Sequence, residues 1–597
     1  MKKTLKNIFT GITQRYICAL FVVVPVFYSC IDTEPKEVLD YKYAYNDLNA
    51  ADAAIRGLYG QFMTLVDKVI VLNELRADLM DVTNYATTDL QEINISRPSK
   101  GNVWADVTPF YNLVQNCNDI LFNFDEMLKD NRFSKPEYDE RYSDVAALRT
   151  WIYLQLGIHF GRVPYITQPI ITLSDLDKAG TELDLNALIT ELISCMENLP
   201  TLENYRNSPL VQNRVDGYSL IPMFINKKLL LADLYLFDDQ YEKAAVLYRT
   251  IMGIYEHLGG GNNSADRTYH VCIEESWSKG VNPWCYAVLL DYNNVADNFV
   301  YNAWREMFAG TSTSSRALNE MIWFFNYDMK FLPEYSLRKL FDLPADNGKY
   351  QIKPSKYAVN NLWGAETQIN GLGFDARGLT GGFDETDYGY RIRKFSYFSQ
   401  FPAGDTKGGW YLYRAGMLHL RYAEAANRAG YLKVAWAIVN DGIYGSSFRF
   451  RRPDGSSYTG DSILVSGDNP QNPYPFPYNF DARYTDSPIR IRGSWRQNNG
   501  IRGRANLPAV AFPAECITKR DSMLFLEKFI IRESALELGF EGHRWEDLIR
   551  VSRRLNKENA GSGDRFLWDE NLAKKYEKIG GGADLSSSDK WFLPLYK

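Results

Sequence analysis

Apolar residues recur at three- and four-residue spacing along much of the first half of the chain. From Thr108, such positions fill one face of a helix that would have Thr108 as its N-cap and Pro109 in its first turn. Residues 144–160 and 185–199 repeat the pattern. The spacing therefore predicts that helices dominate this half of the chain.

Two further segments alternate small and aromatic residues in the manner of a tetratricopeptide hairpin. Residues 225–252 form two helical stretches separated by the polar break 238–240. Residues 420–430, followed by 432–440, repeat this arrangement much later in the chain. Because the two hairpins are far apart, long inserts must separate them. The predicted fold is mostly α, a tetratricopeptide-like helical-repeat scaffold with long loop-rich inserts that carry short β-strands.

The inserts differ from the helices in composition. Residues 259–315 and 345–410 are rich in Gly, Asn, Asp, Tyr and Trp, and residues 449–513 contain many Pro, Gly and Asn residues. Between the first two inserts, the short apolar run 321–325 suits an isolated strand better than a helix. Loops of this length are usually functional or disordered, and their aromatic content argues against disorder.

The N-terminus has the pattern of an export signal. Basic residues precede an apolar run, residues 17–27, that is too short to span a bilayer and suits a signal peptide. The run ends at Ser29-Cys30, which resembles a lipobox, so we expect cleavage after residue 29 and acylation of Cys30. More than one acyl chain on Cys30 would give stable anchoring in a membrane. An ordinary signal peptide with an unmodified Cys30 is the alternative.

Composition and charge narrow the function. The chain has 597 residues, 45% of them hydrophobic and 23% charged, which is ordinary for a globular protein, but its aromatic content of 14% is high. Loss of residues 1–29, which hold four cationic side chains and no acid, would change the formal charge from −6 to −10. Nucleic acid is therefore not expected as a partner.

Cysteine and histidine usage gives no sign of a metal site. The five histidines are scattered, and no CxxC pair or HExxH motif occurs. No metal or other cofactor is predicted, although the Asp- and Asn-rich inserts would permit calcium.

The segment 537–550, ELGFEGHRWEDLIR, concentrates charge beside large apolar groups. Its pattern predicts a helix that ends near Gly539, a turn through Gly542 and a second helix that carries Trp545 inward. Acids and bases at such a junction usually pair with each other, so a structural salt-bridge network is favoured over a catalytic cluster of Glu537, Glu541 and Asp547 near His543 and Arg544.

This segment closely resembles the C-terminal signature of the SusD/RagB family, the surface glycan-binding lipoproteins of Bacteroidetes. Further motifs fall in the family's order: the helix 145–160 ending in Gly161-Arg162-Val163-Pro164, FDARG at 374–378, LRYAEAANRAG at 420–430 and GIRGRANL at 500–507. The resemblance implies a single SusD-like body over residues 30–597. We divide it into an N-terminal helical part (30–258), an aromatic insert (259–410), a hairpin (411–445), a second insert (446–520) and the signature helices (521–597).

The resemblance also implies a location and a partner. Such a protein is anchored by lipid in the outer membrane, faces the cell exterior and covers a SusC-like TonB-dependent transporter. Glycan fragments are captured between the two proteins and imported, and the lid breaks no bond.

Sugar rings need flat aromatic platforms with amide and carboxylate groups at their rims. The inserts and the early loop 75–103 supply both kinds of side chain. The candidate glycan-binding residues are Trp277, Trp284, Trp304, Trp363, Arg76, Asp78, Asn84 and Tyr85.

There are two alternatives to a glycan-binding protein: a peptide-binding protein with the same fold, and an enzyme. The same fold could carry peptides, as in the RagB branch of the family, and peptide capture depends more on backbone hydrogen bonds than on exposed rings. A surface glycoside hydrolase would need two acids about 5–10 Å apart across a cleft, which a sequence with 73 acids does not reveal.

Overall fold

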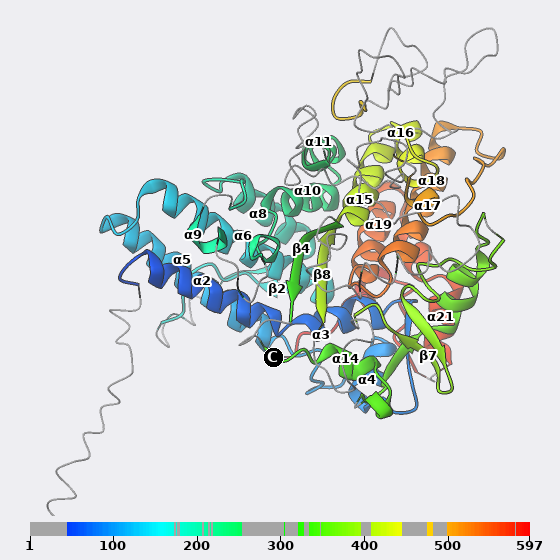
Figure 1. Ribbon diagram of the computed structural model, residues 1–597, viewed down its shortest axis with the longest axis horizontal. Coiled ribbons are helices and arrows are strands. Elements are labelled where there is room, and N and C mark those ends of the chain that lie inside the picture. Colours follow the sequence, from blue (N-terminus) through cyan, green and yellow to red (C-terminus); the bar gives the residue numbers. More distant parts are fainter. Residues whose placement is uncertain are drawn as a thin grey trace, which may run out of the picture. The chain divides into compact units, whose positions relative to one another are not determined.

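The computed structural model describes residues 45–597 except for short and long gaps at residues 172–174, 176–179, 206–207, 213–214, 216–218, 253–303, 305–307, 309–319, 328–332, 347, 370, 396–407, 444–473, 481–497, 499, 579–580 and 597. The chain divides into two compact units, residues 1–51 and 52–597. Figure 1 shows the described helices and strands, coloured along the chain.

The predicted helices of the first half are present. They are α5 (Thr108–Lys129), α6 (Lys135–Phe160) and α8 (Leu185–Glu197), each with a continuous buried face. Two boundaries differ from the prediction. The N-cap of α5 is Val107 rather than Thr108, whose N–H donates to the Asp106 carboxylate at 2.9 Å. Helix α6 begins nine residues earlier than expected because the backbone N–H and hydroxyl of Ser134 both donate to Glu137, closing a capping box.

Both hairpins are confirmed, and they pack against each other. The first consists of α10 (Lys227–Phe237) and α11 (Tyr241–Met252), and the second of α15 (Ala415–Arg428) and α16 (Leu432–Val439). Helix α11 contacts α15, so repeats that are separated in sequence are neighbours in space (Figure 1). The small residues Ala232, Ala244 and Ala245 are fully buried where the helices approach. The inserts are therefore looped out of one continuous helical body.

The strand predicted at residues 321–325 is present but not isolated. It is β4 (Met321–Asn326), which pairs antiparallel with β8 (Gly409–Arg414). Its Trp323 packs in an aromatic core in which the Phe62 ring stacks on Trp410 at 5.1 Å and on Trp323 at 5.5 Å. An apolar run buried along its whole length needs a partner strand for its backbone groups, and β8 supplies it.

The C-terminal signature folds as its sequence predicts. Helix α18 (Lys519–Leu538) ends beside Gly539, and α19 (Arg544–Glu558) begins after Gly542, which has a φ of +94°. Trp545 is fully buried. Helices α20 (Ser562–Leu567) and α21 (Glu570–Glu577) follow.

The remaining described elements are α2 and a set of shorter helices and strands. The strands in the described residues pair antiparallel in two-stranded ladders: β1 with β5, β2 with β3, β4 with β8 and β6 with β7. These elements are α2 (Leu48–Met63), α3 (Val66–Ile70), η2 (Val71–Leu75), β1 (Met80–Val82), α4 (Thr88–Asn94), β2 (Arg162–Pro164), β3 (Glu182–Asp184), α9 (Pro209–Gln212), η3 (Ile221–Met223), α14 (Leu337–Phe341), η5 (Pro344–Asp346), β5 (Ile352–Pro354), η6 (Ala358–Leu362), η7 (Trp363–Ala365), β6 (Phe383–Thr386), β7 (Gly389–Ile392), α17 (Gly500–Arg504) and η9 (Ser588–Lys590).

The described helices include none that combines the length and the apolar character needed to cross a membrane.

Candidate functional site

The acids of the C-terminal signature are buried in ion pairs. Glu537 accepts hydrogen bonds from Arg414 at 2.7 Å and Arg377 at 3.3 Å and also pairs with Arg504. Burial acts to raise the pKa of Glu537, but these guanidinium groups outweigh it and hold the pKa far below the ordinary value. The Glu541 carboxylate accepts hydrogen bonds from two nitrogens of Arg414, at 2.7 and 2.9 Å.

A second cluster joins α15 to α19. Arg550 donates to Glu424 at 2.6 Å and to Asp547 at 3.0 Å, and Arg421 pairs with Asp547 at 2.5 Å. His543 lies 3.9 Å from Glu546, and although burial lowers its pKa, the interaction with this carboxylate raises it overall. The predicted salt-bridge network is thus present, and its acids are enclosed by arginines rather than open to a substrate.

Two of the candidate ligand-binding residues belong to this buried framework. Arg76 is fully buried: it donates to the Ser96 hydroxyl at 3.0 Å and the Trp591 carbonyl at 2.8 Å, and its guanidinium lies 4.0 Å from the centre of the Trp545 ring. Asp78 receives two hydrogen bonds of 2.7 Å from Arg544. Partners from the C-terminal segment therefore hold both side chains in the core, whereas the predicted ligand contacts would need them at the surface.

The candidate tryptophans divide into those that are buried and those outside the described residues. Trp304 is fully buried, with the Arg504 guanidinium 4.9 Å from its ring centre, so it is a core residue rather than an exposed platform. Trp363 is 1% exposed and donates its indole N–H to the Leu536 carbonyl at 3.1 Å. Trp277 and Trp284, like Cys30, lie outside the described residues.

Asn84 and Tyr85, the other two candidates, are exposed on a tight turn after β1. The N–H of Tyr85 donates to the Thr83 hydroxyl at 3.1 Å, and the N–H of Thr83 donates to the Gln351 carbonyl at 2.9 Å. The turn thus extends the ladder of β1 and β5. It holds the ring of Tyr85 at the surface, where 55% of the residue is accessible.

Three tyrosines from separate parts of the chain meet beside this turn, and we call Tyr85, Tyr350 and Tyr388 the tyrosine cluster. The ring centre of Tyr350 lies 6.4 Å from that of Tyr85 and 6.4 Å from that of Tyr388. Tyr350 is buried, whereas Tyr388 is 55% exposed, like Tyr85. The buried ring therefore supports two exposed ones.

The β6–β7 hairpin positions Tyr388. Its loop is Asp387-Tyr388, and the following Gly389 has a φ of +106°, which an L side chain rarely adopts. The Tyr350 hydroxyl donates to the carbonyls of Tyr390 at 2.9 Å and Tyr388 at 3.2 Å, and burial raises its pKa. The sequence analysis missed Tyr350 and Tyr388. For Tyr388 there was one local signal, an aromatic residue followed by Gly389 in a short turn between strands.

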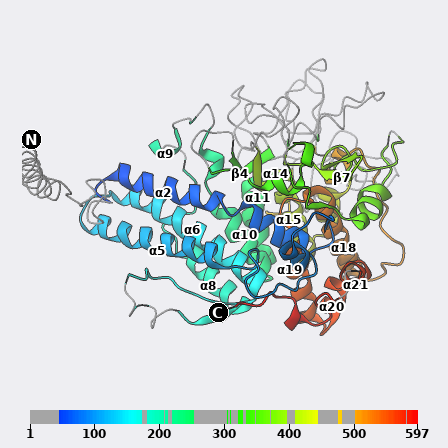
Figure 2. The ribbon, with the colours of Figure 1, turned by 90° about the horizontal axis from the view of Figure 1, so that it is seen from below.

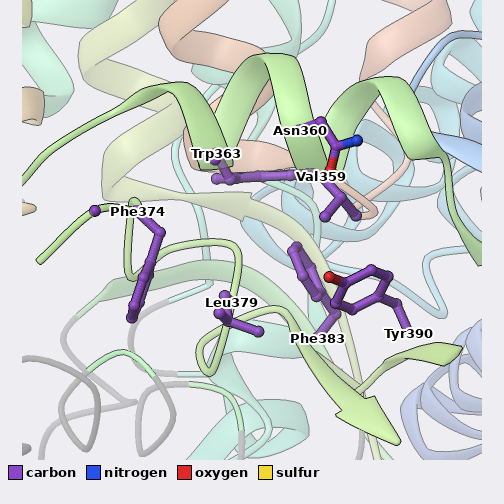
Figure 3. A pocket seen from close by; sticks show the side chains of 9 residues that line it. Val359, Asn360, Trp363, Phe374, Leu379, Phe383 and Tyr390 are labelled. Carbon is purple, nitrogen blue, oxygen red and sulfur yellow. The ribbon is translucent and has the colours of Figure 1, made fainter.

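A pocket of about 380 Å³ adjoins the same hairpin (Figure 3). Trp363 and Val359 line it from one helical segment, and Phe383 packs edge-on against Trp363 with ring centres 5.5 Å apart. Leu379 lies below them, and Phe374 and Tyr390 lie at the two sides of the pocket. The remaining lining residues are Asn360, Gly364 and Gly373. The sequence singled out Trp363 in this pocket, but not the rings around it.

The tyrosine cluster and the pocket are parts of one surface region. Tyr388 and Tyr390 lie on the same hairpin, and the Tyr350 hydroxyl binds the carbonyls of both. Strand β5 also contacts β7. Rings with an amide at the rim suit the C–H faces and hydroxyls of a sugar.

Within the described residues, no three His, Cys, Asp or Glu side chains are grouped as a metal site would require. Much of the Asp- and Asn-rich inserts, including residues 253–303 and 444–473, lies outside the described residues.

Comparison with known proteins identifies the fold. Residues 497–594 match the model of the SusD family. Among solved structures, a SusD superfamily protein from Bacteroides vulgatus aligns with a TM-score of 0.54 and 15% identity over 89% of this chain and 92% of its own. The surface glycan-binding protein A from Bacteroides uniformis gives 0.54 and 14% over 91% and 95%, and a SusD-like carbohydrate-binding protein from Bacteroides fragilis gives 0.51 and 12% over 85% and 86%.

No curated protein sequence matches the chain. The family match covers the buried ion-pair helices, and the structural match covers most of both chains. The C-terminal signature, residues 497–594, thus matches the SusD family, and the chain has a SusD-like fold.

Proposed function

We propose that the protein is a non-catalytic glycan-binding protein of the cell surface that captures oligo- or polysaccharide with its tyrosine cluster. The observation that carries the proposal is the pair of rings Tyr85 and Tyr388, each 55% exposed and both placed by the buried Tyr350. Flat, preorganised rings at a surface are what a sugar face needs, because little conformational entropy is lost on binding.

Two further observations support a glycan ligand. Asn84 is exposed next to Tyr85 and offers an amide at the rim of the cluster. The similar structures include a surface glycan-binding protein and a SusD-like carbohydrate-binding protein, which share this fold. Proteins that share one fold can have different functions, so our proposal rests on the exposed rings and not on the fold.

The location rests on the N-terminal export pattern and on the resemblance to the SusD/RagB family, and the partner rests on that resemblance alone. An acylated Cys30 would anchor the protein in the outer membrane with its body facing the cell exterior. A SusC-like TonB-dependent transporter would receive the glycan. The acids that looked catalytic in the sequence are enclosed by arginines, which supports capture without bond cleavage.

Affinity electrophoresis tests the proposed ligand class. The protein carrying Cys30→Ser, which cannot be acylated, is run through gels that contain plant, host or microbial polysaccharides, and a protein hydrolysate is titrated separately by calorimetry. Retardation by one polysaccharide class, without release of reducing ends, supports the proposal. Heat from peptides with no glycan response would move the protein to the RagB-like function with peptide cargo.

A matched pair of variants tests the site. Tyr388→Ala removes an exposed ring of the cluster. Phe122→Ala removes a ring that is 40% exposed on α5, a helix that lies well away from β7 in both views (Figures 1 and 2). Retardation that falls with the first variant and persists with the second supports the site, and equal retardation of both contradicts it.

A further inference from the structure

The pocket beside the tyrosine cluster has a lining that suits a different chemical group from a sugar. Its walls carry four aromatic rings and the aliphatic side chains of Leu379 and Val359. Among the described residues that line it, Asn360 and Tyr390 carry the polar side chains and none is charged. A pyranose with a hydroxyl on most of its carbons would leave many hydroxyls unpaired there.

Size and shape favour a planar ring. A cavity of roughly 150 Å³ already holds benzene in a protein core, so a pocket of about 380 Å³ has room for a substituted ring. Trp363 and Tyr390 each pack edge-on against Phe383, with ring centres 5.5 Å apart, so these three rings form one continuous wall, and Phe374 lies apart from them on the other side of the pocket (Figure 3). An inserted ring would therefore meet aromatic side chains in stacked or edge-on contact.

The pocket is also linked to the surface that we propose for the glycan. The Tyr350 hydroxyl holds the backbone of Tyr388, an exposed ring of the cluster, and of Tyr390, a wall of the pocket. Tyr388 and Tyr390 are separated only by Gly389, and two residues of any chain span at most about 7 Å, so a sugar chain lying on Tyr388 would be close enough to place a short side group in the pocket.

We propose that the pocket binds an aromatic acyl group that is ester-linked to the captured glycan. The inference rests on the proposed function for the sugar chain, but the pocket itself can be tested without one. The Asn360 amide lies at the rim, where it can bond to a phenol hydroxyl or an ester carbonyl of the acyl group. The protein would then prefer esterified glycans to the same glycans without esters.

Gly373 provides a way to close the pocket. A Cβ at this position would meet no atom within 4 Å, and the residue is not in the left-handed region, so a larger side chain is tolerated by the backbone. Gly373→Phe would fill the pocket, and Gly373→Ala is the matched control that leaves it open. Phe374→Ala, which removes one wall, is a second route to the same test.

The first arm uses methyl 4-hydroxycinnamate, observed by saturation-transfer NMR. We expect millimolar binding to the wild type and to Gly373→Ala, at least a tenfold loss with Gly373→Phe and a severalfold loss with Phe374→Ala. Absence of binding to the wild type, or equal binding to Gly373→Phe, would overturn the assignment of the pocket.

The second arm compares an esterified oligosaccharide with its saponified form. We expect the ester to tighten binding about tenfold in the wild type and not in Gly373→Phe, which corresponds to burial of part of one ring. Failure of the tyrosine variants to weaken the saponified form would count against the proposed function alone. Competition by a phenylalanine peptide, with no gain from the ester, would overturn the glycan ester as the occupant.

Discussion

In helices α18 and α19 charged side chains point into the core, whereas in the turns of residues 83–86 and 386–389 tyrosines point to solvent. Glu537 is fully buried among three arginines, and Tyr388 is 55% exposed on a two-residue loop. Charge density in the sequence therefore marks the framework of this protein, and uncharged rings at turns mark the surface that can meet a ligand.

The difference has an energetic basis. A buried carboxylate is tolerated only if its partners replace the lost water, which requires several arginines in fixed positions. An exposed tyrosine needs only a rigid turn beneath it. The two regions should consequently respond in opposite ways to mutation, the first in stability and the second in binding.

Glu537→Gln should have the largest effect. It leaves Arg414, Arg377 and Arg504 without their shared carboxylate, and we expect a loss of about 3–5 kcal/mol in the free energy of unfolding, measured with urea. Glu570→Gln, whose partner Lys574 is exposed, is the matched control and should cause no measurable change. Similar stability for both variants would refute the framework role of Glu537.

Asp78→Asn separates the framework from the binding surface at a residue that the sequence suggested for the ligand. Loss of the paired bonds to Arg544 should cost about 2–4 kcal/mol, while the folded variant keeps its affinity for glycan. Denaturation and calorimetry on the same sample give both quantities. Unchanged stability with weakened binding would restore Asp78 to the ligand site.

Glu74 should make stability depend on pH. Its carboxylate accepts hydrogen bonds from the backbone N–H groups of Gly542 and His543, with N···O distances of 2.7 and 3.0 Å. Burial outweighs these bonds and raises the pKa of Glu74 from 4.5 to about 7. Between these pH values the folded protein holds a proton that the unfolded chain has released, so stability falls as pH rises through the window, by up to about 1.4 kcal/mol per unit.

Glu74→Gln removes this titration. The advantage in unfolding free energy of the wild type over the variant should therefore shrink by about 3 kcal/mol between pH 4.5 and 7, because other buried acids contribute equally to both proteins. Urea denaturation across this range measures it. A difference that stays constant with pH would show that Glu74 is ionised throughout.

The smallest expected effect is at the surface. Tyr85→Ala should weaken glycan binding about 3–10-fold, the loss of one stacked ring, with little change in unfolding free energy because the residue is 55% exposed. Calorimetry of wild type, Tyr85→Ala and Phe122→Ala provides the comparison. A large loss of stability in Tyr85→Ala would place this ring in the framework instead.

The sequence predicted the framework better than the site. Helical spacing located α5, α8 and both hairpins, and charge beside apolar residues located the break between α18 and α19, because these signals are local. Burial of Arg76 and Trp304 depended on partners hundreds of residues away, such as the Trp591 carbonyl and Arg504, which no local pattern reveals.

The site itself shows the same limit. Asn84 and Tyr85 could be named as candidates because the early loop 75–103 carries polar and aromatic side chains. Tyr350 and Tyr388 could not, since their value as a platform arises only when β5 lies against β7.

A crystal structure of the protein with the oligosaccharide identified by affinity electrophoresis would test the central claim most directly. We predict that a sugar ring lies flat against Tyr85 or Tyr388, with Asn84 within hydrogen-bond distance of a hydroxyl. A sugar bound elsewhere, with both tyrosine rings still open to solvent, would contradict the account.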